Sequence, residues 1–325
     1  MAPDLTGTSV LVVGADRSGF AAADVLAERG ARVVLVEEAD PAADLELAER
    51  MKILDVLGVE VRVGPEHTAT LPEEIPRLVV AGADCPVDHP LLTAASDRGI
   101  PVWGASELAW RLRPGGAAPW LTVTGSSGVT TTLRLLTEML RSADLRVRVA
   151  GDDEHPVLEA VMDPEPVDVL VVGLAAEQLH WSESISPLAS VCLDAGEDPG
   201  QWASIYANTR IACVYNVEDP QTEDLVREAD VVEGARAIGF TVGVPRRSMI
   251  GLVEDVLADR AFVDHPETSA AELGTISDLA GGSTPQPEVV QNALAAAALA
   301  RAVGIPPAAV RDGMRAFAAG GPPTT

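Results

Sequence analysis

The sequence predicts an α/β protein of two domains, each built on a parallel sheet. Short apolar runs typical of buried parallel strands alternate with longer segments of helical spacing. Glycine turns join a strand directly to a helix at 14–19 and again at 125–128. A stretch rich in Pro and Gly, residues 114–119, separates the two parts as a linker.

The first domain, residues 1–113, is expected to be a small doubly wound sheet. A buried strand at 9–13 leads through the glycine turn into a helix over 20–29, which ends at Gly30, a typical C-cap residue. The second strand, 32–36, ends on Glu37 and Glu38. The remaining elements of this domain are predicted as strands 59–63, 78–80 and 101–103 and helices 45–57, 89–98 and 106–111.

The second domain, residues 120–325, repeats the alternation of strands and helices. The strands are predicted at 120–124, 146–149, 168–172, 191–193 and 211–215. The helices are predicted at 133–141, 157–162, 289–302 and 308–318. Prolines precede the last two helices, where the first turn tolerates them. Residues 320–325 are expected to lack regular structure.

Composition limits the partners of the chain. The net charge is -26 and the pI about 4.4, and such a surface repels nucleic-acid backbones and anionic lipids. We therefore expect no nucleic-acid partner and no membrane insertion. The absence of a long uncharged apolar run or a signal-type N-terminus favours a cytoplasmic protein.

Cysteine and lysine usage limits the chemistry. Cys85, Cys192 and Cys213 are too far apart in sequence to predict a disulfide framework or a zinc site, and no metal site is expected. Lys52 is the only lysine among the 23 basic residues. Any reaction that needs a lysine must use Lys52.

The first glycine turn has two interpretations. Gly14, Ser18 and Gly19 open a helix as in a Rossmann dinucleotide-binding fingerprint, in which glycine lets the backbone approach a pyrophosphate. Asp16, however, stands where the fingerprint has glycine and puts a carboxylate near the phosphate position. Glu37 and Glu38 could accept hydrogen bonds from ribose hydroxyls. The alternative is that the two glycines serve only the turn and helix–strand packing.

The second glycine turn has the context of a phosphate-binding loop. In such loops backbone N–H groups at a helix N-terminus hold phosphate oxygens. The candidate residues of this loop are Gly125, Ser126, Ser127, Gly128, Thr130 and Thr131. A working loop has a lysine before the Ser/Thr, but that position is Val129 here. Weak anion binding and a purely structural loop both remain open.

Several further segments occur in the order found in one family. The segments are residues 100–111, 178–181, 214–220, 239–241 and 292–298. Together with the second glycine turn they resemble the Mur ligase family, most closely its D-glutamate-adding ligases of actinobacteria, over essentially the whole chain. The resemblance implies a Rossmann-like domain for a UDP-linked precursor and a central P-loop-type ATPase domain. It implies amide formation through an acyl phosphate made from ATP with Mg²⁺. Asn216 and Asp219 match the family's nucleotide-base and ribose region.

The resemblance also shows where this chain departs from the family. Val129 replaces the loop lysine, Gly173 a Mg²⁺-binding glutamate, and Asn208 a carbamylated lysine that helps to hold a second metal. Further family positions are changed at Gly82, Ala83, Asp84, Asp152, Ala175, Ala176, Asp194, Pro199, Glu288 and Val289. Phosphoryl transfer depends on charge neutralisation by such groups. We therefore expect no catalytic residues, and a family third domain after Phe317 is expected to be absent.

These departures favour a pseudoenzyme of the peptidoglycan-precursor ligase family. It would bind a protein partner in cell-envelope synthesis, a second copy of itself or a UDP-linked precursor. No cofactor is expected unless the degenerate loop still binds ATP and Mg²⁺. One alternative is an ATP-dependent ligase whose site is rewired around Asp152, Asp194, Glu197 and Asp198. The other is a module that binds a UDP-sugar or nucleotide through the first domain alone.

Overall fold

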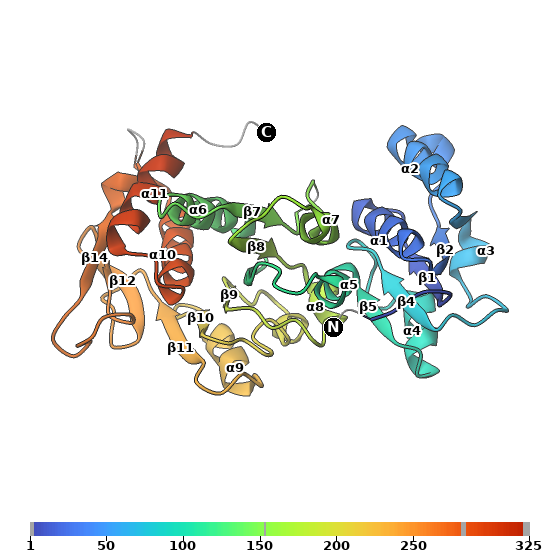
Figure 1. Cartoon of the computed structure of the whole chain (residues 1–325). Coiled ribbons are helices and arrows are strands. Elements are labelled where there is room, and N and C mark those ends of the chain that lie inside the picture. Colours follow the sequence, from blue (N-terminus) through green and yellow to red (C-terminus); the bar gives the residue numbers. More distant parts are fainter. Residues whose placement is uncertain (1–2, 153, 281–283, 321–325) are drawn as a thin grey trace. The chain divides into compact units, whose positions relative to one another are not determined.

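A computed structural model describes residues 3–152, 154–280 and 284–320. The chain divides into two compact units, each with its own sheet (Figure 1). Unit 1 consists of Met1–Ala117, Gly151–Pro164 and Ala175–Ile185. Unit 2 consists of Ala118–Ala150, Glu165–Leu174 and Ser186–Thr325. The predicted α/β class is confirmed, but only the sheet of unit 1 is entirely parallel, because the sheet of unit 2 also contains antiparallel pairs.

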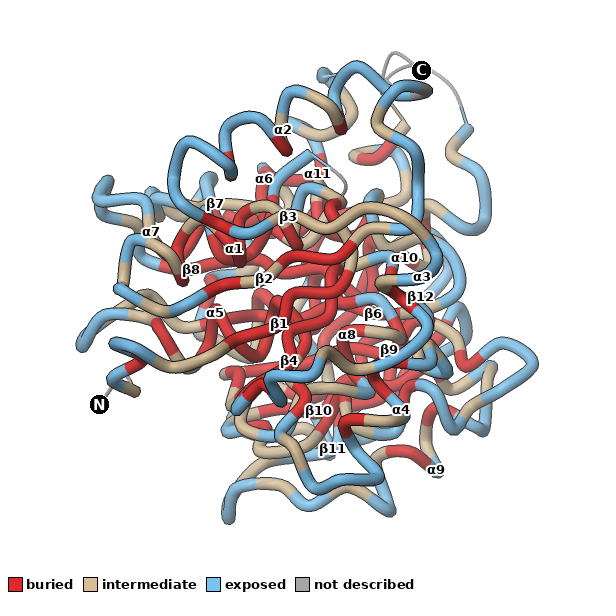
Figure 2. The backbone as a smooth tube through the Cα atoms, turned by 90° about the vertical axis from the view of Figure 1, so that its right-hand side faces the viewer, coloured by how far each residue is buried: buried red, intermediate tan, exposed pale blue. Residues whose placement is uncertain are grey.

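Unit 1 contains a five-stranded parallel sheet in the order β3-β2-β1-β4-β5. Its strands are β1 (Ser9–Val13), β2 (Arg32–Glu37), β3 (Glu60–Val63), β4 (Leu78–Ala81) and β5 (Val102–Gly104). The central strands β1 and β4 consist almost entirely of buried valine and leucine, as the continuous apolar runs predict (Figure 2). The order places the carboxyl ends of β1, β2 and β4 side by side.

Helices connect the strands of unit 1. They are α1 (Arg17–Glu28), α2 (Leu45–Val56), α3 (Pro65–Thr68), α4 (Pro90–Asp97) and α5 (Ala105–Leu112), with a 3-10 turn η1 (Pro41–Ala43). Asp16 caps α1, Asp44 caps α2, and Pro90 occupies the first turn of α4. These three helices each begin where the sequence supplies a carboxylate acceptor or a proline.

Two helices that follow the predicted linker in the sequence belong to unit 1. They are α7 (Val157–Met162) and α8 (Ala176–His180). The predicted division at 113–120 places both segments in the second domain, whereas their contacts place them in unit 1. Gln178 of α8 explains the placement of its helix. Its buried Nε2 donates to the Gly82 carbonyl at 2.9 Å, and its Oε1 accepts from the Ser106 N–H at 3.0 Å.

Unit 2 contains a nine-stranded sheet in the order β14-β13-β12-β11-β10-β9-β6-β8-β7. Its strands are β6 (Trp120–Thr124), β7 (Val147–Ala150), β8 (Val169–Gly173), β9 (Ala189–Cys192), β10 (Ala212–Asn216), β11 (Arg236–Phe240), β12 (Met249–Val253), β13 (Val256–Asp259) and β14 (Ala271–Thr275). The pairs β12–β13 and β13–β14 are antiparallel, and the other neighbours are parallel. The carboxyl ends of β6, β9 and β10 are adjacent in this order.

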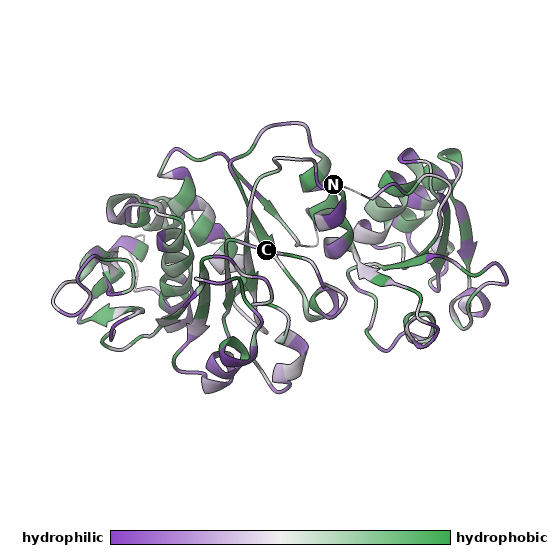
Figure 3. Cartoon of the chain, turned by 60° about the horizontal axis from the view of Figure 1, so that its bottom comes forward, coloured by the Kyte–Doolittle hydropathy of each residue, from purple (hydrophilic) through white to green (hydrophobic). Residues whose placement is uncertain are grey.

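The core of unit 2 joins its helices to the sheet. The helices are α6 (Val129–Arg141), α9 (Pro220–Glu228), α10 (Pro287–Ala302) and α11 (Pro307–Ala319), with 3-10 turns η2 (Pro199–Trp202) and η3 (Ile276–Leu279). Alanines of α10 and leucines of α6 form one buried cluster with the sheet. Small alanine side chains let these helices pack closely, which compensates for the shortage of aromatic residues. The sheet strands are largely green, the hydrophobic colour, in Figure 3.

Most predicted elements are present with small shifts at their ends. The predictions missed β11 to β14, α3 and α9, and α6 begins four residues earlier than predicted, at Val129 rather than 133. Residues 321–325 of the predicted unstructured end lie outside the described residues. None of the described helices combines the length and apolar character needed to cross a bilayer.

Candidate functional site

The glycine loop of unit 2 lies between β6 and the N-terminus of α6, as predicted. Gly128, the residue before the helix, has φ +77°, a left-handed conformation that glycine adopts without strain. A Cβ atom at Gly128 would lie 2.5 Å from Oδ1 of Asn292. Glycine is therefore required by both the backbone conformation and the close approach of α10. The backbone of this loop has the form of an anion-binding turn.

The donors of this loop hold a carboxylate of the same chain. Asp194, just beyond β9, accepts from the N–H of Ser126 at 3.1 Å and from the N–H of Ser127 at 3.2 Å. It also accepts from the Ser126 hydroxyl and, at 3.3 Å, from the Ser127 hydroxyl. These donors are the groups expected to hold phosphate oxygens. In this structure a carboxylate of the chain itself accepts from these donors.

Val129 and Gly173 add no polar group to this loop. Val129 is the first residue of α6, and its half-buried side chain packs against the core of unit 2. Gly173 ends the buried strand β8. Unit 2 contains no lysine, because Lys52 is in α2 of unit 1. Thr130 is exposed and Thr131 half-buried in the first turn of α6.

Asn216 and Asp219 lie beside this loop but are engaged within the protein. The amide of Asn216 donates to the Leu193 carbonyl at 2.8 Å and accepts from the Glu218 N–H at 3.0 Å. Asp219 accepts from the Ala195 N–H at 2.7 Å and caps α9 through the Gln221 N–H at 3.1 Å. Their contacts therefore hold the residues on either side of Asp194.

The glycine turn of unit 1 has the same property. Oδ1 of Asp16 accepts from the N–H groups of Ser18 at 2.7 Å and Gly19 at 2.9 Å. The carboxylate of Glu37 accepts from the N–H of Ala15 at 2.7 Å. The sequence placed the Asp16 carboxylate near the phosphate position, and the structure places it on the first-turn N–H groups of α1. These donors are satisfied without a ligand.

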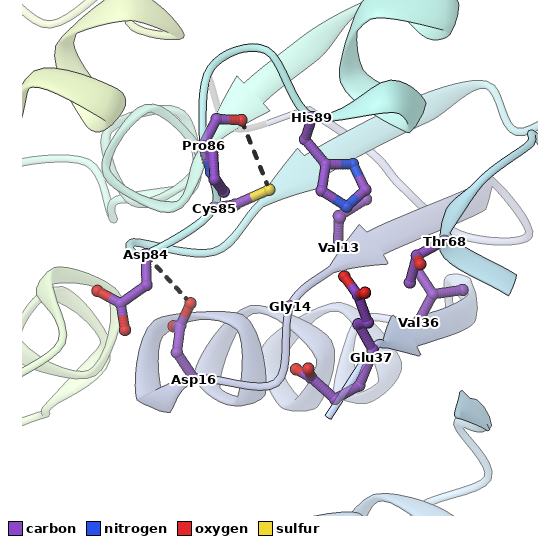
Figure 4. Close-up of a pocket in the computed structure, with 11 residues that line it drawn as sticks. Val13, Gly14, Asp16, Val36, Glu37, Thr68, Asp84, Cys85, Pro86 and His89 are labelled. Carbon is purple, nitrogen blue, oxygen red and sulfur yellow. Dashed lines mark hydrogen bonds between the residues drawn. The ribbon is translucent and has the colours of Figure 1, made fainter. Parts of the chain in front are cut away.

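A cavity of about 290 Å³ adjoins this turn at the carboxyl ends of β1, β2 and β4. Among the predicted residues it brings together Gly14, Glu37 and Glu38, but not Ser18 or Gly19. Its other lining residues are Val13, Asp16, Val36, Thr68, Asp84, Cys85, Pro86 and His89. In Figure 4, Asp16 and Asp84 lie together at one end of the cavity, with Glu37 and Thr68 toward the other. In open α/β sheets, this edge is where ligands bind.

The cavity is acidic and contains one buried thiol. Burial, reinforced by Asp16 and Glu37, raises the pKa of the Cys85 thiol to about 12. Burial also lowers the pKa of His89, whose Nδ1 accepts from the Leu91 N–H at 3.2 Å and caps α4. A neutral His89 with this bond carries its proton on Nε2. Sequence reasoning missed Thr68, Cys85 and His89, because only the fold brings their separate loops to β1.

The acidic residues considered for a rewired metal site are engaged locally. Asp152, in unit 1, accepts from Nδ1 and the backbone N–H of His155, both at 2.8 Å. Asp198 caps the turn η2 through the Gly200 N–H at 3.1 Å, and Glu197 is exposed. Within residues 3–152, 154–280 and 284–320, no group of three His, Cys, Asp or Glu side chains is arranged to hold a metal ion.

A sequence model described as an FAD binding domain matches residues 7–98 of the chain. The match covers β1, the first glycine turn, α1 and β2, so it includes the strand–turn–helix–strand pattern of dinucleotide-binding proteins. In this chain the carboxylates of Asp16 and Glu37 accept hydrogen bonds from the N–H groups of the turn. The match thus describes a shared pattern in less than half of the chain.

Solved structures show the class of fold. The chain has a TM-score of 0.56 to a UDP-N-acetylmuramate:L-alanyl-γ-D-glutamyl-meso-diaminopimelate ligase from Neisseria meningitides, with 18% identity over 95% of this chain and 98% of the other. A UDP-N-acetylmuramate–alanine ligase from Thermotoga maritima gives a TM-score of 0.50 and 20% identity over 95% of this chain and 68% of the other. The two-unit α/β architecture is that of the Mur-type ligases.

Sequence relatives show the family. A UDP-N-acetylmuramoylalanine–D-glutamate ligase from Streptomyces avermitilis is 45% identical over 96% of this chain and 67% of its own length. The enzyme of the same name from Streptomyces coelicolor is 45% identical over 98% of this chain and 68% of its own length. The chain therefore belongs to the Mur ligase family. It spans about two thirds of the length of these relatives.

Proposed function

We propose that this protein is a Mur ligase relative that binds a ligand without transferring phosphate. The observation that carries the proposal is Val129. Where a phosphate-binding loop has its lysine, an apolar side chain packs against the core. Stabilising the charge of a transferring phosphoryl group requires cations at that position, and unit 2 has no lysine to supply one.

The remaining residues of the loop do not fit an ATP–Mg²⁺ complex. The carboxylate of Asp194 lies on the N–H groups that a phosphate would need, so a polyphosphate would meet a like charge at close range. Gly173, at the end of β8, offers no side-chain ligand for a metal. The loop therefore does not provide for phosphoryl transfer from ATP.

The cavity of unit 1 supports binding as the retained function. The relatives are named for a UDP-linked substrate, and the cavity lies at the ligand-binding edge of a doubly wound sheet. Glu37 accepts from the N–H groups of Ala15 at 2.7 Å and Ala39 at 2.9 Å, so its carboxylate is already engaged. Glu38, like Asp84, is an exposed carboxylate that lines the cavity. We propose that Glu38 accepts hydrogen bonds from the ribose of a UDP-linked precursor.

The proposal predicts no ATP turnover. The protein would be incubated with Mg-ATP, UDP-N-acetylmuramoylalanine and D-glutamate, with phosphate release as the measurement and the Streptomyces coelicolor enzyme as the positive control. We expect release no faster than in the absence of protein. Release that depends on all three substrates would overturn the proposal and favour the ligase with a rewired site.

Binding would be measured in parallel by the thermal unfolding of the protein with UDP-N-acetylmuramoylalanine. A ligand at a hundred times its dissociation constant adds about 2.7 kcal/mol to the stability, which raises the midpoint by several degrees. Glu38→Ala should weaken binding by roughly tenfold, because a hydrogen bond to a charged acceptor is lost. Glu49→Ala removes the same charge from the exposed surface of α2 and serves as the control. If the precursor does not raise the unfolding midpoint of the unaltered protein, the ligand to seek is a protein partner or a second copy of the chain.

A further inference from the structure

We infer that Asp194 is a built-in competitor of phosphate that keeps the loop of unit 2 closed to anionic ligands. The inference deepens the proposed function, on which it rests, because it names the group that blocks the site. The carboxylate of Asp194 accepts hydrogen bonds from both hydroxyls and both N–H groups of Ser126 and Ser127. These four donors lie in the turn that precedes α6.

Two neighbouring side chains hold Asp194 in this position through hydrogen bonds to the backbone on either side of it. Asn216, at the end of β10, binds the carbonyl of Leu193, the residue just before it. Asp219 binds the N–H of Ala195, the residue just after it. Both side chains are therefore used to fix the backbone on either side of Asp194. Asn216 and Asp219, which match the family's nucleotide region, here position the carboxylate of Asp194.

Close packing of the loop supports the same conclusion. A Cβ atom at Gly125 would lie 3.0 Å from Cβ of Leu193 and 3.2 Å from Oδ2 of Asp194. Gly125 also has φ +150°, which L side chains rarely adopt. The loop and the segment after β9 therefore fit against each other directly.

Energetics favour the internal carboxylate over a free anion. A group tethered within the fold acts at an effective concentration on the order of millimolar or higher. The carboxylate lies at the N-terminus of a 13-residue helix, where the helix dipole favours negative charge. An incoming phosphate must displace Asp194 and also approach the charge of Asp219. A free phosphate gains no lysine contact in return.

The test measures the binding of inorganic pyrophosphate by calorimetry at low ionic strength. The unaltered protein is compared with Asp194→Ala, which removes the carboxylate, and Asp194→Asn, which removes only its charge. We expect both variants to bind pyrophosphate at least about tenfold more tightly than the unaltered protein. Asp198→Ala is the matched control, because Asp198 lies in the same loop but caps η2 instead of the glycine turn.

Two results would overturn the inference. One is an equal affinity of the unaltered protein and Asp194→Asn for pyrophosphate. The other is an increase in affinity in Asp198→Ala as large as that in Asp194→Asn. If Asp194→Ala fails to fold, the nearly isosteric Asn variant still decides the question. Because this test involves no turnover, its failure is distinct from phosphate release by the unaltered protein, which would refute the proposed function.

Discussion

Glu107 shows how a single polar residue can organise unit 1. Its side chain is fully buried in α5, and its carboxyl oxygens accept from Arg111 Nε at 2.6 Å and the Ser184 hydroxyl at 2.6 Å. They also accept from the N–H groups of Glu183 and Ser184, each at 3.1 Å. A buried acceptor with this many donors is stabilising only while every donor remains paired. The segment after α8 is thereby fixed to α5.

Glu107→Gln should destabilise the protein by about 2–3 kcal/mol, because the new amide NH₂ would face donors instead of accepting from them. Urea unfolding measures the change. Glu223→Gln makes the same substitution at an exposed i,i+4 pair with Arg227 and should cost less than about 0.5 kcal/mol. Equal losses for the two variants would show that the buried network does not contribute.

At the scale of elements, α6 and α11 approach closely because of one glycine. A Cβ atom at Gly313 in α11 would lie 2.5 Å from the backbone nitrogen of Met139 in α6. Both helices contribute to the core cluster of unit 2, which includes Met139, Val310 and Met314. An alanine at this point would separate the helices or strain their backbones.

Gly313→Ala should therefore destabilise the protein by about 1 kcal/mol or more. Helix propensity alone predicts the opposite sign, a gain of up to about 1 kcal/mol, but overpacking costs about 1–3 kcal/mol. Gly115→Ala, where a Cβ atom meets nothing within 4 Å, should change the stability by less than about 0.5 kcal/mol. Thermal unfolding of the two variants distinguishes the effects, and a more stable Gly313→Ala would contradict the close packing.

Elements with a continuous apolar pattern could be predicted from the sequence, and those without it could not. The apolar run of β1 and the glycine turn before α6 can each be recognised from their own residues. By contrast, β14 contains Glu272 and Gly274, and only two of its five residues are buried. Its place in the sheet comes from antiparallel pairing with β13, a contact that the residues of β14 do not indicate by themselves. The placement of α7 and α8 in unit 1 could not be predicted either, because it depends on contacts with residues distant in the sequence.

At the scale of the whole molecule, each unit has a glycine turn whose donors hold the chain's own carboxylates. Asp16 could be anticipated at the first turn, because it occupies a fingerprint position only two residues after Gly14. Asp194 could not be assigned to the second turn, because it lies 68 residues from Ser126 and is brought there by the pairing of β6 with β9. Family resemblance predicted the fold but not this contact.

Burial of the three cysteines predicts a property of the entire fold. All three are buried free thiols, and burial raises the pKa of Cys85 and Cys213 from 9.0 to about 12 and that of Cys192 further still. A thiol reagent should therefore label the native protein at least about a hundredfold more slowly than the denatured protein. Rapid labelling of the native protein would contradict the buried placement.

The same thiols give a pH dependence of stability. Because their folded-state pKa values lie above the unfolded value, their contribution is complete below about pH 9 and is lost as the pH rises toward about 12. The free energy of unfolding should fall across this range. Replacing Cys213 with alanine should make that fall shallower.

Lys52 has a practical consequence for studying the two units separately. It is exposed on α2 in unit 1 and is the only lysine of the chain. Chemistry directed at lysine side chains will therefore mark unit 1 at one defined point and leave unit 2 unmodified. A dye placed there reports from α2 of unit 1, and a solid support coupled there holds every molecule by the same helix.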